Sequence, residues 1–140
     1  MTQPALAPAN ELHRMLDDLV ERVPAAELAV LTSADGLSLV ASGAVSAETG
    51  EVVAATASGL HALAVAAGEQ LCGGTTLRMI VEMEHVLLAI EPAGRDALLA
   101  VAFTGAPDPA EVNGPVTETA ERAARALGPG RQRAGSGDER

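Results

Sequence analysis

The sequence predicts a mixed α/β (α+β) fold, a three-layer α/β/α sandwich around a five-stranded, mainly antiparallel sheet. Two observations predict it. The apolar periodicity along the 140 residues changes in the order helix-strand-strand-helix-strand-strand-strand-helix. Residues 97–103 (ALLAVAF) are apolar at every position, which is typical of a central strand covered on both faces. Helices are therefore expected on both sides of the sheet.

The composition indicates one folded domain with a flexible segment at each end. Apolar residues make up 48% of the chain, which has one Phe and no Tyr or Trp, so we expect an aliphatic core. Residues 1–9 hold two prolines and are predicted to form a flexible N-terminal arm. Residues 10–127 form the domain. Residues 128–140 are Gly-rich and polar, and we expect a disordered C-terminal tail because nothing there offsets the entropy of ordering.

The charge of the chain excludes several classes of partner. The formal net charge is −10, and all nine basic residues are Arg. A nucleic-acid-binding protein needs a basic surface, so no nucleic-acid partner is expected. An anionic membrane surface is disfavoured for the same reason, and no uninterrupted apolar run reaches the length of about 18 residues that membrane insertion requires. A single Cys and the lack of a secretion signal fit a cytoplasmic location.

The first third of the chain predicts a helix followed by a strand hairpin. Asn10 is a suitable N-cap and Pro24 ends the helix. Between them, one apolar stripe recurs at spacings of three and four: Leu12, Met15, Leu16, Leu19, Val20 and Val23. Residues 28–33 and 37–42 are short apolar runs, and the Asp-Gly pair between them predicts a tight turn.

The second helix is predicted to begin at Ser46 or Thr49 and to run to about Leu71. One side is expected to face the core and carries Val53, Thr56, Leu60, Leu63, Ala64, Ala67 and Leu71. The opposite side has charge only at its two ends and carries Glu51, Ala55, Ser58, Ala62, Val65 and Glu69, with Ala54 and Ala66 beside them.

A helix that is apolar on both sides is normally buried on both sides. In a chain this short, we expect the second cover to come from another chain. The alternative interpretation is that Ala is simply a strong helix former and needs no partner.

Three more strands and a helix complete the predicted order. Residues 75–84 alternate, with Leu77, Met79, Val81 and Met83 on one face and Thr76, Arg78, Ile80, Glu82 and Glu84 on the other. This pattern predicts a half-buried strand at a sheet edge, where unpaired backbone groups are open to another chain. Residues 86–91 and 97–103 are the fourth and fifth strands. The last helix begins either at Asp108-Pro109 or near Pro115, and Gly128 closes it.

The sequence offers no convincing set of catalytic or ligand-binding residues. His13, His61 and His85 are not at zinc-binding spacings, and there is no G-x-S-x-G motif. Gly68 to Thr75 superficially follows the phosphate-loop pattern, but the Lys is missing and a helix precedes the segment where a strand should stand. We therefore expect no enzyme activity, no cofactor and no metal, and an interaction module.

Three stretches carry a family resemblance: LAVLTSADGLSLVASG (28–43), ASGLHALAVAAGEQLCGG (57–74) and the strand set of residues 75–103, which includes LLAIEPAGRDALLAVAF. The chain resembles the Roadblock/dynein-light-chain family, especially its small bacterial members, over about residues 10–127. This resemblance implies a roadblock/profilin-like fold and a homodimer in which the third strands pair and the second helices pack side by side. The implied interface residues are Ala55, Ser58, Ala62, Val65, Ala66, Thr76, Arg78 and Ile80. Glu84 and His85 depart from the family, in which many members have Gly at this turn.

The resemblance also implies a partner. Bacterial relatives act with a small Ras-like GTPase as regulators or scaffolds, and some are encoded beside a sensor-kinase-like protein. The expected function is thus a non-catalytic homodimeric adaptor or regulator of such a GTPase in bacterial signalling. Neither Arg78 nor Arg95 is placed by the sequence as an arginine finger, so any stimulation of hydrolysis would come from repositioning the GTPase's own residues. The alternative is a small-molecule-sensing module of similar shape, which requires an internal cavity.

Overall fold

A computed structural model describes residues 3–105 and 107–128. Three helices and five strands follow one another in the predicted order: α1 (Gln3–Arg22), β1 (Ala26–Ser33), β2 (Ser38–Ala41), α2 (Ala47–Leu71), β3 (Met79–Glu82), β4 (Val86–Pro92), β5 (Ala97–Thr104) and α3 (Pro109–Leu127).

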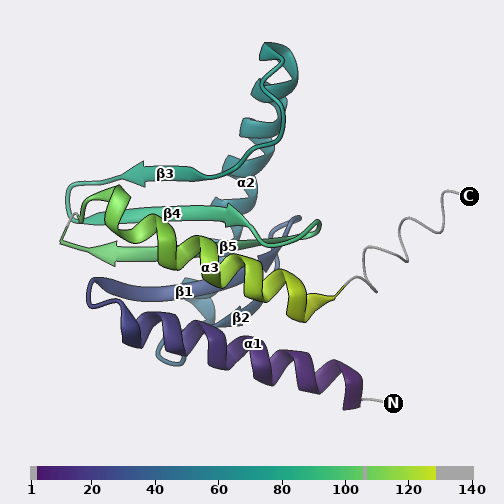
Figure 1. The fold of residues 1–140 in the computed structure, drawn as a ribbon, viewed down its shortest axis with the longest axis vertical. Coiled ribbons are helices and arrows are strands. Elements are labelled where there is room, and N and C mark those ends of the chain that lie inside the picture. The colour runs from purple at the N-terminus through teal and green to yellow at the C-terminus, as the bar shows by residue number, and fades with distance from the viewer. Residues whose placement is uncertain (1–2, 106, 129–140) are drawn as a thin grey trace, which may run out of the picture.

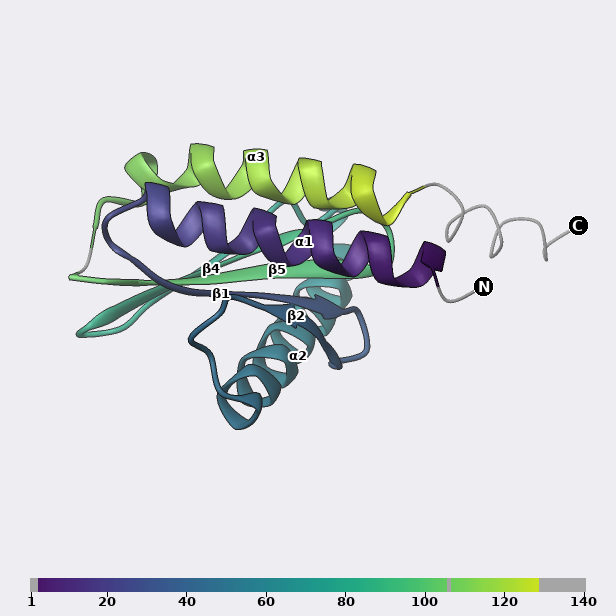
Figure 2. The same cartoon turned by 90° about the horizontal axis from the view of Figure 1, so that it is seen from below.

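The strands form one sheet in the order β2-β1-β5-β4-β3, with every neighbouring pair antiparallel. The two helices α1 and α3 lie on one face, and α2 crosses the other (Figures 1 and 2). This confirms the predicted α/β/α sandwich. β5 is the central strand, as its continuous apolar run predicted, and β2 and β3 are the two edges.

The core has two parts because the sheet is covered on both faces. On β5, Leu99, Val101 and Phe103 pack into the larger cluster under α1 and α3. Leu98 and Ala100, which alternate with them, pack into the smaller cluster under α2. A strand that feeds both clusters has no position left for a polar side chain, which explains its apolar sequence.

The N-terminal segment differs from the prediction. α1 begins at Gln3, so residues 3–9, which were expected to belong to a flexible arm, are helical. Pro4 falls in the first turn, where the backbone N–H has no helical partner in any case, and the alanines that follow favour a helix. At the other end, Gly128 caps α3, and the rest of the predicted tail, residues 129–140, lies outside the described part of the chain.

The structure corrects the predicted length of β3 and decides between the two predicted starts of α3. β3 is four residues long, far shorter than the predicted 75–84, and it pairs only with β4. The outer side of β3 has no partner strand among the residues that the structure describes, so the strand is held along one side only and its ends leave the sheet readily. α3 begins at Pro109, with the Asp108 carboxylate accepting from the Ala110 N–H at 3.1 Å, and continues through Pro115.

Candidate interaction surfaces

The start of α2 is fixed by its cap and its sheet contacts. The Ser46 side chain accepts a hydrogen bond from the Thr49 N–H at 3.1 Å, so Ser46 is the N-cap of the two starts that the sequence offered. Gly50, Ala54 and Ala57 are buried in the first half of the helix, and the helix contacts β1, β2 and β5. These small residues let the helix axis approach the sheet closely.

The second half of α2 leaves the sheet. Figure 1 shows the helix rising beyond the β3 edge before the chain turns back. No residue of α2 after Ala57 is fully buried. Leu63 is 69% exposed and Leu71 is 77% exposed.

The outward face of α2 is exposed and carries no charged side chain between Val52 and Gln70. We define this outward face by its exposed residues on the side away from the sheet: Val52, Ala55, Thr56, Gly59, Ala62, Leu63, Ala66, Ala67 and Gln70. The largest apolar side chains on it are Val52, 61% exposed, and Leu63. An exposed helix face of this length normally carries charged side chains. An exposed helix face without charge is typical of a surface that another molecule covers, and no segment of the described chain covers this one.

The predicted orientation of α2 was only partly right. Val53 and Leu60 do pack under the helix, but Thr56, Leu63, Ala67 and Leu71, predicted to face the core, are exposed. Ala54, predicted beside the outer face, is fully buried. When a helix is apolar all round, its sequence does not show which side faces the sheet. Here the small residues face the sheet, because they allow the helix to approach it closely.

The five helical residues predicted at the interface lie in three kinds of environment. Ala55, Ala62 and Ala66 are exposed on the outward face. Val65 is 39% exposed at its flank. Ser58 is half-buried and points the other way, because its hydroxyl donates to the Ala34 carbonyl at 2.8 Å in the β1–β2 turn.

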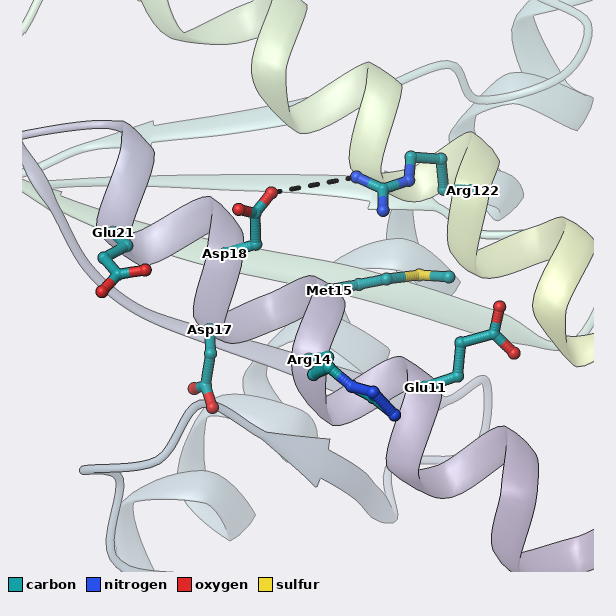
Figure 3. A pocket seen from close by; sticks show the side chains of 7 residues that line it. All are labelled: Glu11, Arg14, Met15, Asp17, Asp18, Glu21 and Arg122. Atoms are coloured by element: carbon teal, nitrogen blue, oxygen red, sulfur yellow. Dashed lines mark ion pairs between the residues drawn. The ribbon is translucent and has the colours of Figure 1, made fainter.

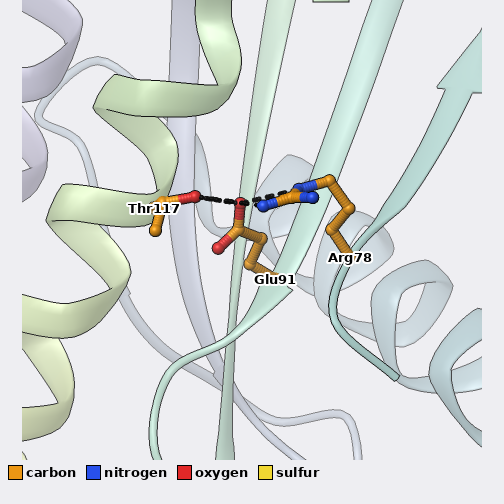
Figure 4. Close-up of polar contacts among 3 residues, drawn as sticks. All are labelled: Arg78, Glu91 and Thr117. Atoms are coloured by element: carbon orange, nitrogen blue, oxygen red, sulfur yellow. Dashed lines mark hydrogen bonds and ion pairs between the residues drawn. The ribbon is translucent and has the colours of Figure 1, made fainter. Parts of the chain in front are cut away.

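The three predicted strand residues do not share one exposed face. Thr76 is half-buried and precedes β3. Ile80 is half-buried and packs against the larger core cluster, beneath α1 and α3. Arg78 also precedes β3, and its side chain lies over Glu91 and Thr117 (Figure 4).

Arg78, Glu91 and Thr117 form a polar cluster between β3, β4 and α3. The Glu91 carboxylate is 7% exposed and accepts from the Thr117 hydroxyl at 2.7 Å and from Arg78 Nε at 3.3 Å. A buried carboxylate is tolerated when charged and neutral donors satisfy it in this way. The cluster ties the segment before the edge strand to α3. No local sequence pattern indicates this cluster, because its members are 13, 26 and 39 positions apart.

A charged groove runs between α1 and α3 (Figure 3). Its lining is Glu11, Arg14, Met15, Asp17, Asp18, Glu21 and Arg122. Asp18 lies 2.8 Å from Arg22 Nε and 3.9 Å from Arg122 Nη1, and Asp17 accepts from the Gly43 N–H at 2.7 Å. These carboxylates are matched by donors of the chain itself and hold local structure together.

A second groove lies beneath the second half of α2. His61, Val65 and Glu69 form one wall, and the β4–β5 turn with its flanks forms the other: Pro92, Gly94, Arg95, Ala97 and Leu98. Ala34, Gly74, Thr75 and Thr76 complete the lining. We refer to this second space as the α2 groove. Its volume is about 620 Å³, compared with about 790 Å³ for the groove between α1 and α3. Its walls come from four separate segments, so sequence reasoning did not find it.

Within residues 3–105 and 107–128, no group of three or more His, Cys, Asp or Glu side chains could hold a metal ion. By length and composition alone, the stretch Ala47–Gln70 of α2 could cross a membrane. In the structure, however, its first half packs on the sheet through Gly50, Ala54 and Ala57. The expectation that no segment inserts into a membrane stays a prediction.

The comparison with protein families assigns the domain. The Roadblock/LC7 domain matches residues 12–103, about two-thirds of the chain. The chain belongs to the Roadblock/LC7 family. The predicted resemblance is therefore confirmed. No curated protein sequence matches the chain significantly.

Solved structures share the roadblock fold. A Roadblock/LC7 domain from Streptomyces avermitilis is 30% identical, with a TM-score of 0.77 over 82% of this chain and 96% of that one. The gliding protein MglB from Thermus thermophilus is 21% identical, with a TM-score of 0.76 over 86% of this chain and 90% of that one. Profilin II from Acanthamoeba castellanii is 16% identical, with a TM-score of 0.57 over 81% of this chain and 96% of that one. The last two identities are low and show the fold alone.

Proposed function

We propose that this Roadblock/LC7 protein is a non-catalytic, homodimeric adaptor or regulator of a small Ras-like GTPase in a bacterial cytoplasmic signalling system. The observation that carries the proposal is the outward face of α2. This exposed surface is largely apolar and carries no charged side chain between Val52 and Gln70, and no other segment of residues 3–105 and 107–128 covers it.

A second copy of the chain is the occupant that this surface fits. Small side chains at Ala55, Gly59, Ala62 and Ala66 permit close approach of a facing helix. The β3 edge supports the same arrangement, because its outer backbone groups have no partner in the described chain. Helix packing together with strand pairing could bury the area of roughly 1,200–2,000 Å² that a stable interface requires.

The GTPase part of the proposal rests on the family resemblance and on the likeness in fold to bacterial MglB. One MglB structure has a tetrameric arrangement, which supports a role in assembly for this fold. The acidic balance of the chain, −10, would speed association with a basic surface on the partner. Arg78 is engaged by Glu91, which argues against its use as an arginine finger.

The first test is the oligomeric state, measured by light scattering after gel filtration at tens of micromolar. The wild-type chain is expected to be a dimer. Ala62→Arg places charge and bulk on the outward face and is expected to give a monomer with an unchanged circular dichroism spectrum. Glu118→Arg, an exposed site on α3, is the matched control and should remain a dimer. A monomeric wild type, or a dimeric Ala62→Arg variant, contradicts the assembly.

The second test is partner binding. A Ras-like GTPase from the same organism, loaded with GDP or with a non-hydrolysable GTP analogue, is titrated with the dimer by calorimetry. We expect binding to at least one nucleotide state and no GTP hydrolysis by the roadblock protein alone. Failure of both loaded forms to bind, or hydrolysis without the GTPase, overturns the adaptor proposal.

A further inference from the structure

The α2 groove exists because α2 diverges from the sheet. The first half of the helix is seated on the sheet through Gly50, Ala54 and Ala57, while the second half extends past the β3 edge (Figure 1). The wedge between the second half and the β4–β5 turn has a volume of about 620 Å³. Pockets that enclose small organic ligands typically measure about 300–1,000 Å³.

The lining is apolar with a few polar groups at defined places. Val65, Pro92 and Leu98 provide apolar wall. Arg95 is exposed and forms no ion pair with any residue of the part of the chain that the structure describes. Its turn is well defined, since Gly94 has a φ of +86° and the Ala93 N–H donates to the Ala97 carbonyl at 2.8 Å.

The donors around the groove match a carboxylate. The Arg95 guanidinium presents parallel N–H groups that pair with both oxygens of a carboxylate. The His61 ring, which is half-buried, and the hydroxyls of Thr75 and Thr76 add further donors. We propose that the α2 groove binds a small monocarboxylic acid with an apolar body.

The charged residues around the groove favour a ligand with a single negative charge over a ligand with several. Arg95 is the only arginine in the lining, and Glu69 opposes it from α2. Together with the overall charge of −10, this arrangement repels a nucleotide or another polyanion. The apolar body of the acid would lie against Val65 and Leu98 and remove both from water.

This site is distinct from the surface proposed for dimerisation. The groove is on the sheet side of α2, whereas Ala62 and Leu63 are exposed on the outward face. A ligand that bridges Arg95 and α2 would brace the second half of the helix against the β4–β5 turn. The proposal therefore stands whether or not the chain acts on a GTPase.

The test uses 4-methylpentanoate and its neutral amide as probes, titrated into the full-length ¹⁵N-labelled protein. We expect the acid to shift the amide resonances of His61, Val65 and residues 94–98, with an affinity of about 1 mM for so small a molecule. The amide should bind at least about tenfold more weakly, because it cannot make the charge-assisted pair.

Three variants identify the groups responsible. Arg95→Gln should weaken binding of the acid roughly tenfold or more, because the charge-assisted pair with the carboxylate is lost. The fold should be unaffected, because Arg95 is an exposed turn residue. Arg125→Gln, an exposed arginine on α3, is the matched control and should bind as the wild type does. Glu69→Gln should bind the acid about two- to threefold more tightly, because a like charge is removed. Equal binding of acid and amide, shifts outside the groove, or an unaffected Arg95→Gln variant overturns the proposal.

Discussion

The hydroxyl of Thr117 on α3 donates a 2.7 Å hydrogen bond to the buried carboxylate of Glu91 on β4. Arg78 completes the arrangement from the other side, with Nε 3.3 Å from the same oxygen. Glu91 faces the α3 side of the sheet, where its neighbours along β4 are the apolar residues Leu87 and Ala89. A carboxylate in that position requires both donors to offset the loss of water.

Removal of either donor to Glu91 should therefore destabilise the fold. Thr117→Val keeps the shape of the side chain and is expected to lower the free energy of unfolding by about 1 kcal/mol. Arg78→Met should cost about 1–3 kcal/mol, because it leaves a buried charge with a single neutral donor. Urea denaturation measures both. Glu118→Gln, the exposed neighbour on α3, should change stability by less than about 0.5 kcal/mol.

Ser58 should act within its own chain. Ser58→Ala removes the 2.8 Å hydrogen bond to the Ala34 carbonyl, and we expect a loss of about 0.5–1.5 kcal/mol in unfolding free energy. The dimer dissociation constant should be unchanged. Thr56→Ala is the control for stability, since the Thr56 hydroxyl donates to the Val52 carbonyl of its own helix and ties no other element to α2 in the described part of the chain. A Ser58→Ala variant that dissociates but keeps its stability would place Ser58 between subunits.

Gly59 and Gly114 provide a matched pair for the outward face. Each lies inside a helix, and a Cβ added at either position meets nothing within 4 Å in the single chain. Gly114→Ala should stabilise the protein by about 0.5–1 kcal/mol, because glycine is a poor helix former. Gly59→Ala should give the same gain in the isolated subunit but weaken the dimer, since the added methyl group faces the second copy. If both variants dimerise with unchanged affinity, close packing at Gly59 is wrong.

Phe103 is the single aromatic residue of the chain and is completely buried in the cluster under α1 and α3. Phe103→Ala is expected to cost about 3–5 kcal/mol, because aliphatic neighbours cannot fill the space that the ring leaves. Phe103→Leu should cost less, about 1–2 kcal/mol, since it keeps most of the apolar volume. Differential scanning calorimetry gives the order of the two. Equal stability of all three proteins would contradict the position of Phe103 in the core.

Much of the fold could be predicted from the sequence because local patterns and burial agreed. The apolar run of residues 97–103 identified the central strand, and Ser46 and Asp108 were each one of two starts that the sequence offered for α2 and α3. The Asp35-Gly36 pair predicted the β1–β2 turn, where Gly36 has a φ of +97°. Each of these patterns lies within a few consecutive residues, so these elements could be predicted without knowing which distant residues are in contact.

The orientation of α2, the length of β3 and the positions of the polar groups depended on the tertiary structure. A helix apolar all round does not specify which side meets the sheet; the close approach at Gly50 and Ala54 decided it and turned Leu63 outward. Glu91 meets its donors, and Arg95 lines the same groove as residues of α2, only because the fold brings together segments far apart in the sequence. Local propensity determined the elements and their order, whereas packing between elements decided which side chains are covered and which remain available to a partner.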